Sequence, residues 1–107
     1  MINIRIVCRK NDFREFHSAG HANFNTGNDI VCSAVSALSY ALLGTLSNIP
    51  GLKIEKEVGD GKMDIFISSD NQEVRKIANT VFSTITIGVR QIAGSYPDNV
   101  VVDIVNL

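Results

Sequence analysis

The sequence predicts an α+β fold of two layers, in which a mainly antiparallel sheet carries two helices in the order β-β-α-β-β-α-β. Short segments alternate apolar and polar residues, as half-buried strands do, and two longer segments repeat apolar residues at helical spacing. Turn residues separate these segments. The chain has 107 residues, of which 45% are apolar and 20% charged. We therefore expect a single folded domain over residues 1–107.

The first two strands are expected to form a hairpin. Apolar residues recur at every second position from Ile2 to Cys8, residues 10–12 supply a turn, and residues 13–20 form the second strand. Glycine, asparagine and threonine from Gly20 to Asp29 then predict a loop. A helix should follow over residues 30–47. Its apolar face is formed by Val35, Leu38, Leu42 and Leu46.

A second hairpin follows this helix. Leu52 and Ile54 alternate with charged residues, Gly59-Asp60-Gly61 forms the turn, and apolar residues line one face of the returning strand. Those residues are Met63, Ile65 and Ile67.

The second helix should begin near residue 70 and end near residue 93. Asp70 and Glu73 resemble a capping box, while Gly94 and Pro97 terminate the helix. Its apolar positions are Val74, Ile77, Ala78, Val81, Phe82, Ile85, Val89 and Ile92. Residues 100–105 form a last apolar strand.

Composition excludes several classes of protein. Ten basic and eleven acidic residues give a formal net charge of −1, so no basic field favours nucleic acid and we expect no direct nucleic-acid partner. No run approaches the roughly 20 apolar residues of a membrane span, and the N-terminal residues lack the pattern of a signal peptide. We therefore expect a cytoplasmic protein without membrane contact. Its two cysteines should remain thiols.

The segment from Gly20 to Cys32 carries the chemistry. It places His21 where a strand ends and Cys32 where a helix begins. Cysteine catalysis needs a thiolate, an imidazole and amides for the oxyanion. If Asp29 caps the helix, Cys32 lies in its first turn, where unpaired amides and the helix dipole favour a thiolate and can receive an oxyanion. The charge of Asp29 opposes this effect.

Structural interpretations of the same residues remain open. Cys32 could be a small buried hydrophobe, Asp29 a simple cap and Ser36 a helix-packing serine. Gly20 and Gly27 could be turn residues only.

Two further residues are expected to lie outside any site. Cys8 shares the inward side of the first strand with three isoleucines, which predicts a core position. His17 and His21 have a chelating spacing on a helix, but on a strand four residues span about 13 Å, too far for one metal ion. We expect no metal site.

The residues Gly20-His21-Ala22 and Gly27-x-Asp29-Ile30-Val31-Cys32-x-Ala34-x-Ser36 closely resemble the signature of the bacterial ribosomal-processing cysteine protease family, Prp. The resemblance extends over the whole chain. It implies that Cys32 is the nucleophile and His21 the general base and acid. Gly20, Asp29 and Ser36 match positions with supporting roles.

The resemblance also implies a substrate and an assembly. Such enzymes remove a short N-terminal extension from a large-subunit ribosomal protein, after an apolar, often aromatic residue. They need no metal or organic cofactor and form homodimers. Asn23, Phe24 and Gly27 fall in a polar loop suited to a flap over the peptide. Tyr40 and Leu43 lie off the apolar stripe of their helix, which favours a dimer surface there.

Two alternative functions from other classes remain open. One is a non-enzymatic, ribosome-associated or peptide-binding dimeric module in which Cys32 only packs. The other is thiol chemistry without proteolysis, such as a redox or acyl-transfer reaction.

Overall fold

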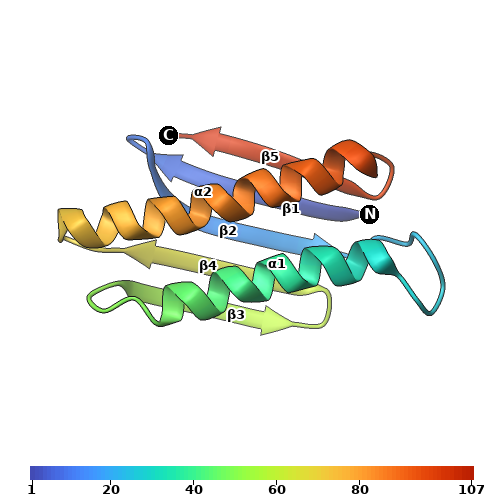
Figure 1. Cartoon of the computed structure of the whole chain (residues 1–107), viewed down its shortest axis with the longest axis horizontal. Helices are drawn as coiled ribbons and strands as arrows, with labels where there is room; N and C mark the ends of the chain where they lie inside the picture. Colours follow the sequence, from blue (N-terminus) through green and yellow to red (C-terminus); the bar gives the residue numbers. More distant parts are fainter.

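The computed structural model describes residues 1–107 and places both helices on one face of a five-stranded sheet (Figure 1). The other face of the sheet carries no helix, and the principal extents are 44 × 23 × 17 Å. The elements in chain order are β1 (Ile2–Arg9), β2 (Asp12–Gly20), α1 (Ile30–Ser47), β3 (Lys53–Gly59), β4 (Lys62–Ser68), α2 (Gln72–Ser95) and β5 (Val100–Asn106).

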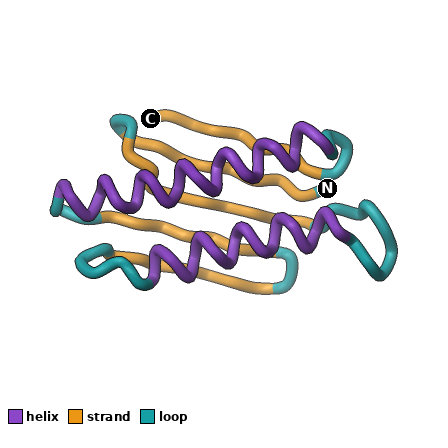
Figure 2. The backbone as a smooth tube through the Cα atoms, viewed as in Figure 1, coloured by secondary structure: helices purple, strands orange, loops and turns teal.

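The sheet has the strand order β3-β4-β2-β1-β5. The β1–β2, β2–β4 and β3–β4 pairs are antiparallel, whereas β5 returns from α2 to lie parallel to β1, with Ile2 beside Val100. Figure 2 shows this alternation of strands and helices along the chain. The predicted fold class and element order are confirmed, and the sheet is mostly antiparallel.

The core lies between the sheet and the two helices. Alternate residues of β1 and β4 enter it, as the period of two predicts. The alternation breaks at Val7, which is buried together with Cys8 where the β1–β2 register shifts. The largest fully buried side chains are Phe16, Phe82, Ile4, Ile6, Leu42, Leu46 and Ile65.

The packing of α1 differs from the sequence prediction at two residues. Leu43, expected off the apolar stripe, is buried in the chain's own core, and Leu38 is only partly buried. A Cβ added to Gly88 of α2 would lie 2.9 Å from Leu38 Cδ1, so Leu38 packs between the helices. Tyr40 is 56% exposed, as an off-stripe position should be.

The expectation that no segment approaches a membrane span is corrected by α1. This helix has a mean hydropathy of 1.7 and is long and apolar enough to cross a membrane by those two measures. The core helix of a globular protein passes the same test. Here Val31, Val35, Leu42 and Leu46 pack into the core.

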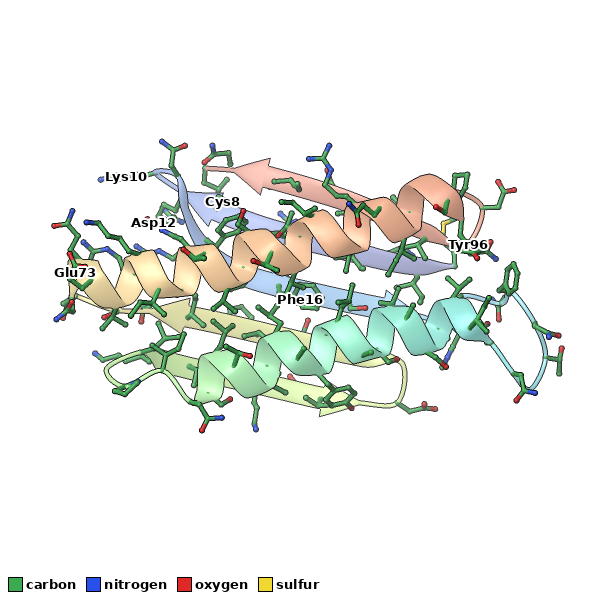
Figure 3. The ribbon with its side chains drawn as sticks, viewed as in Figure 1. Cys8, Lys10, Asp12, Phe16, Glu73 and Tyr96 are labelled. Atoms are coloured by element: carbon green, nitrogen blue, oxygen red, sulfur yellow. The ribbon has the colours of Figure 1, made fainter.

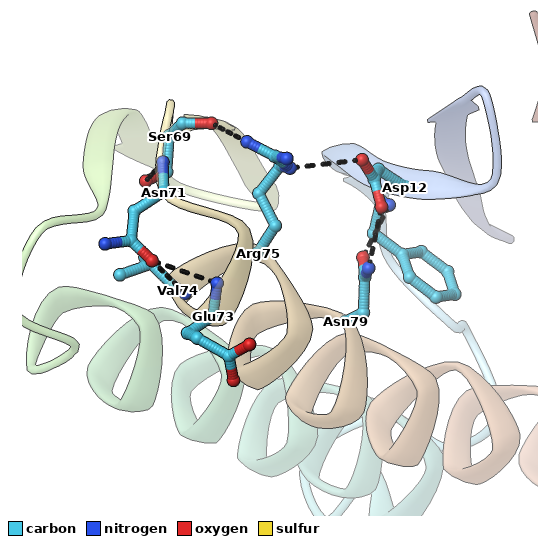
Figure 4. Close-up of polar contacts among 8 residues, drawn as sticks. Asp12, Ser69, Asn71, Glu73, Val74, Arg75 and Asn79 are labelled. Atoms are coloured by element: carbon cyan, nitrogen blue, oxygen red, sulfur yellow. Dashed lines mark hydrogen bonds and ion pairs between the residues drawn. The ribbon is translucent and has the colours of Figure 1, made fainter.

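The start of α2 also differs from prediction. Asn71, not Asp70, is the N-cap, and its side chain accepts hydrogen bonds from the Glu73 and Val74 amides (Figure 4). Ile77, expected in the core, is 52% exposed. The buried residues of this helix include Ala78, Phe82, Ile85 and Val89.

The elongated molecule has two different ends. At one, the β1–β2 turn lies beside the start of α2, and Cys8 and Asp12 mark this hairpin end (Figure 3). At the other, the β2–α1 loop projects near the β3–β4 turn and the N-terminus, and Tyr96 lies at this loop end. The candidate residues of the site fall at the loop end.

Candidate active site

The structure brings His21 and Cys32 to the same cavity. β2 ends at Gly20, so His21 is the first residue beyond the sheet, and Cys32 is the third residue of α1. Both side chains line a cavity of about 420 Å³ between α1, the end of β2 and the β3–β4 turn. His21 is exposed and Cys32 is half-buried. A base and a thiol therefore face one solvent-accessible space.

Asp29 caps α1 and also holds the loop. One carboxylate oxygen accepts from the Cys32 amide at 2.9 Å, and the other accepts from the Phe24 amide at 3.0 Å. The bond from the Cys32 amide, with further loop amides, holds the pKa of Asp29 below its usual range. Because both oxygens are engaged by backbone amides, the geometry favours a cap over an orienter of His21.

This cap changes the expected oxyanion donors. The amide of Cys32 donates to the Asp29 side chain, and the amide of Ser33 donates to the Asp29 carbonyl at 3.0 Å. In this conformation neither amide is free for a tetrahedral oxyanion. Of the first-turn amides expected to be able to receive the oxyanion, the amide of Cys32 is therefore engaged by the cap in this conformation.

The β2–α1 loop borders a second space. His21, Cys32 and Asp29 line a cavity of about 520 Å³ together with the predicted loop residues Asn23 and Phe24. Gly27 lines neither cavity, although its positive φ of 94° shapes the turn before Asp29.

The loop is fixed at its first residues. Asn99 donates its side-chain amide to the carbonyl of Ala22 at 3.0 Å, and Ala22 itself is buried. The Phe24 ring meets Tyr96 edge to face, with centroids 5.2 Å apart. A loop joined in this way to the end of α2 is placed over the candidate site.

Glycines allow a close approach around His21. A Cβ added to Gly61 would lie 2.7 Å from His21 Nε2, and a Cβ added to Gly20 would collide with the carbonyl oxygen of Met1. Both glycines have positive φ, 102° for Gly20 and 64° for Gly61. Gly20 therefore has a backbone reason to be glycine that does not depend on catalysis.

Apart from Ser36, which was expected to have a supporting role, the sequence did not identify the other walls of the cavity. Ile2, Val35 and Met63 give it an apolar lining, while Ser36, Tyr40 and the buried Ser39 come from α1. The β3–β4 turn contributes Gly59, Asp60, Gly61 and Lys62. The two glycines around Asp60 were the available signal, but they equally predict an ordinary hairpin turn.

The remaining candidates lie elsewhere. His17 lies between two carboxylates, with Nδ1 2.7 Å from Asp64 and Nε2 2.8 Å from Glu15. The hydrogen bond from His17 is the main cause that lowers the pKa of Asp64. Cys8 is buried, and desolvation, followed by the charge of Asp12, raises the pKa of its thiol. The structure contains no group of three or more acidic, histidine or cysteine side chains arranged to hold a metal.

Comparison with known proteins gives one family and several similar structures. The model of the family described as cysteine protease Prp matches residues 1–101. No curated protein matches the chain significantly.

The solved structures share the fold over nearly the whole chain. The ribosomal processing protease Prp from S. aureus, with a covalently linked product peptide, has a TM-score of 0.85 at 20% identity, covering 97% of this chain and 99% of that one. The same protease with a substrate peptide has a TM-score of 0.79 at 19% identity, with the same coverage. SMU.848 from Streptococcus mutans has a TM-score of 0.81 at 27% identity, covering 100% of this chain and 96% of that one.

Proposed function

The chain belongs to the cysteine protease Prp family, and from that premise we propose that it removes a short N-terminal extension from a large-subunit ribosomal protein. One observation carries the assignment of roles. His21 from the end of β2 and Cys32 from the start of α1 line one cavity. Cys32 is the nucleophile and His21 the general base and acid.

The reaction proceeds through an acyl-enzyme. The Cys32 thiolate attacks the scissile carbonyl carbon, and the carbon–nitrogen bond breaks as His21 protonates the leaving amine. His21 then takes a proton from water, whose oxygen attacks the thioester carbonyl. The carbon–sulfur bond breaks, so that Cys32 recovers its thiolate while His21 stays protonated, and the new carboxyl group leaves and loses its proton to solvent. These steps need no metal or organic cofactor.

The cavity favours an apolar residue before the scissile bond. Ile2, Val35 and Met63 line the cavity and are all buried, so an apolar side chain entering it would lose water-exposed surface. This supports cleavage after an apolar, often aromatic residue.

The second cavity supports a role for the loop in binding the peptide. Asn23 and Phe24 line it beside His21 and Cys32, so a peptide crossing the thiol would contact both residues. The S. aureus protease is described with a substrate peptide and with a covalently linked product peptide. We assign to Asn23 and Phe24 contacts with the peptide, and to Gly27 the bend of the loop.

The proposal includes a cellular setting. The protein acts in the cytoplasm as a homodimer, without direct nucleic-acid or membrane contact. Exposed Tyr40 on α1 remains a candidate for the dimer surface, whereas buried Leu43 does not. Sedimentation at tens of micromolar, a rough working range for such interfaces, tests the dimer directly.

The decisive experiment is trimming of the ribosomal precursor, followed by intact mass in buffer containing EDTA. The wild type should release the extension, whereas Cys32→Ala and His21→Ala should each lose at least about 10⁴-fold in rate, since nucleophile and base act as a unit. The double variant should be no slower than either single variant. Cys8→Ala is the matched control and should trim at the wild-type rate.

The same experiment separates the alternatives. A peptide-binding module or a redox protein would leave the precursor intact in every sample. Trimming by Cys32→Ala at a rate near wild type would contradict the assignment of the nucleophile.

A further inference from the structure

The β3–β4 turn lies directly against the imidazole of His21. A Cβ added to Gly61 would come within 2.7 Å of His21 Nε2 and 2.9 Å of Cε1. Real Cβ atoms do not approach side-chain atoms so closely, so the bare Cα of Gly61 is what the ring packs against. No other residue type fits under the ring in this position.

The turn is itself fixed to the end of β2, directly before His21. The carbonyl of Gly61 accepts a hydrogen bond of 2.8 Å from the amide of Gly20, the residue before His21. Gly61 also has a φ of 64°, the left-handed conformation that glycine adopts without steric cost. The backbone of His21 and the surface against its ring are therefore held by the same short turn.

We propose that Gly61 is a positioning residue for the reaction, because its bare Cα sets where the His21 imidazole lies relative to Cys32. This inference rests on the proposed roles of His21 and Cys32. Gly61 touches neither thiol nor peptide bond in this role. It limits how closely the His21 imidazole can approach the β3–β4 turn.

The inference predicts a separation between stability and activity. A methyl group at position 61 must displace the ring, because the ring is the far end of a side chain that can rotate. A displacement of about 1 Å can cost about 100-fold in rate. The cost to folding should be only that of a left-handed alanine.

The test compares Gly61→Ala with Gly51→Ala. Gly51 also has a positive φ, 82°, but lies in the α1–β3 connection, where an added Cβ meets only Val74 Cγ2 at 3.3 Å. Both variants should lose similar thermal stability, whereas precursor trimming should fall about 100-fold in Gly61→Ala alone. Gly61→Asn adds the same Cβ and tolerates positive φ better, so it answers the question if Gly61→Ala does not fold.

A second readout needs no substrate. Iodoacetamide alkylates the thiolate with loss of iodide, so its rate reports how well the imidazole stabilises that thiolate. At pH 6, Gly61→Ala and Gly61→Asn should label Cys32 about tenfold more slowly than wild type, and His21→Ala should do the same. The rates of all variants should converge in urea, where no imidazole is held near the thiol.

The trimming and labelling measurements distinguish a failure of the proposed function from a failure of the positioning role. If wild type leaves the precursor intact but the labelling profiles differ as stated, the substrate is wrong and the positioning role stands. If folded position-61 variants trim and label like Gly51→Ala, the positioning role is overturned. It is also overturned if His21→Ala labels Cys32 as wild type does at pH 6.

Discussion

The two ends of the molecule each contain a cysteine, and they use it in opposite ways. At the hairpin end, Cys8 is buried and lines none of the cavities described here. At the loop end, Cys32 is half-buried and lines two of them. The same side chain is therefore packing material in one place and an accessible thiol in the other.

The two ends differ in whether side chains pack against their turns. At the hairpin end, Asn79 accepts from the Phe13 amide and donates to Asp12, while Arg75 pairs with Asp12 and donates to the Ser69 carbonyl (Figure 4). The Phe13 ring stacks on Phe82 at 5.1 Å.

At the loop end, glycines lie at the end of β2 and in the β3–β4 turn. Gly20, Gly59 and Gly61 line the cavity, and no side chain extends from them to fill it. Side chains therefore pack around Cys8 at the hairpin end, whereas the bare backbone of these glycines leaves open the cavity that Cys32 lines.

The largest expected effect is a difference in labelling between the two thiols. In the native protein at neutral pH, Cys32 should react with iodoacetamide at least about 100-fold faster than Cys8, because Cys8 becomes accessible only when the structure opens. Peptide mapping by mass measures both rates in one sample. In urea the rates should become similar. Equal native rates would remove the contrast between the two ends.

The next effect concerns the closure of the hairpin end. Asn79→Ala removes the acceptor of the half-buried Phe13 amide and should lower the free energy of unfolding by about 1–3 kcal/mol. Urea denaturation measures this loss. The trimming rate of the folded variant should stay at the wild-type value. Thr80→Ala, at an exposed neighbouring position of α2, controls for the change in helix propensity.

A smaller effect distinguishes the two interpretations of Asp29. Asp29→Asn keeps a good N-cap and removes a negative charge near Cys32, so labelling of Cys32 should be equal to wild type or up to about threefold faster. A sharp loss of labelling in a variant with a normal circular dichroism spectrum would instead assign to Asp29 the orientation of His21.

The smallest effect is on the alkaline side of the stability curve. Because burial raises the pKa of the Cys8 thiol, the folded protein keeps this proton at pH values where the unfolded chain has released it. Stability should therefore fall as the pH rises above about 8.5, the ordinary value for cysteine. Cys8→Ala should show a shallower decline in urea midpoints between pH 8 and 10. Cys32→Ala serves as the control.

Local patterns were sufficient to predict most of the fold. The period of two in β1 and β4, the turn glycines and the apolar spacing of the helices gave the element order. They did not give the parallel pairing of β5 with β1, because an apolar strand carries no mark of its neighbour. Leu43 and Ile77 were misplaced because one residue rotates a helix position by about 100°, which is enough to exchange core for solvent.

The candidate site was likewise predictable only in part. His21, Asp29 and Cys32 belong to one short segment, so strand and helix boundaries were enough to bring them together. The cavity wall at Asp60 and Gly61 comes from a hairpin far along the chain, and it reaches His21 only because β4 pairs with β2. That pairing is a property of the assembled sheet. The capping-box spacing of Asp70 and Glu73 placed the N-cap one residue early, because Asn71 suits the position equally well.

The anchoring of the β2–α1 loop has an evolutionary consequence. Ala22 and Val31 are each 1% exposed, while the residues between them are largely exposed. Apart from Asp29, which caps α1, residues between the two anchors can therefore be substituted, inserted or deleted without a change in the core. Selection can therefore change this segment in sequence and length while the scaffold that carries Cys32 stays the same.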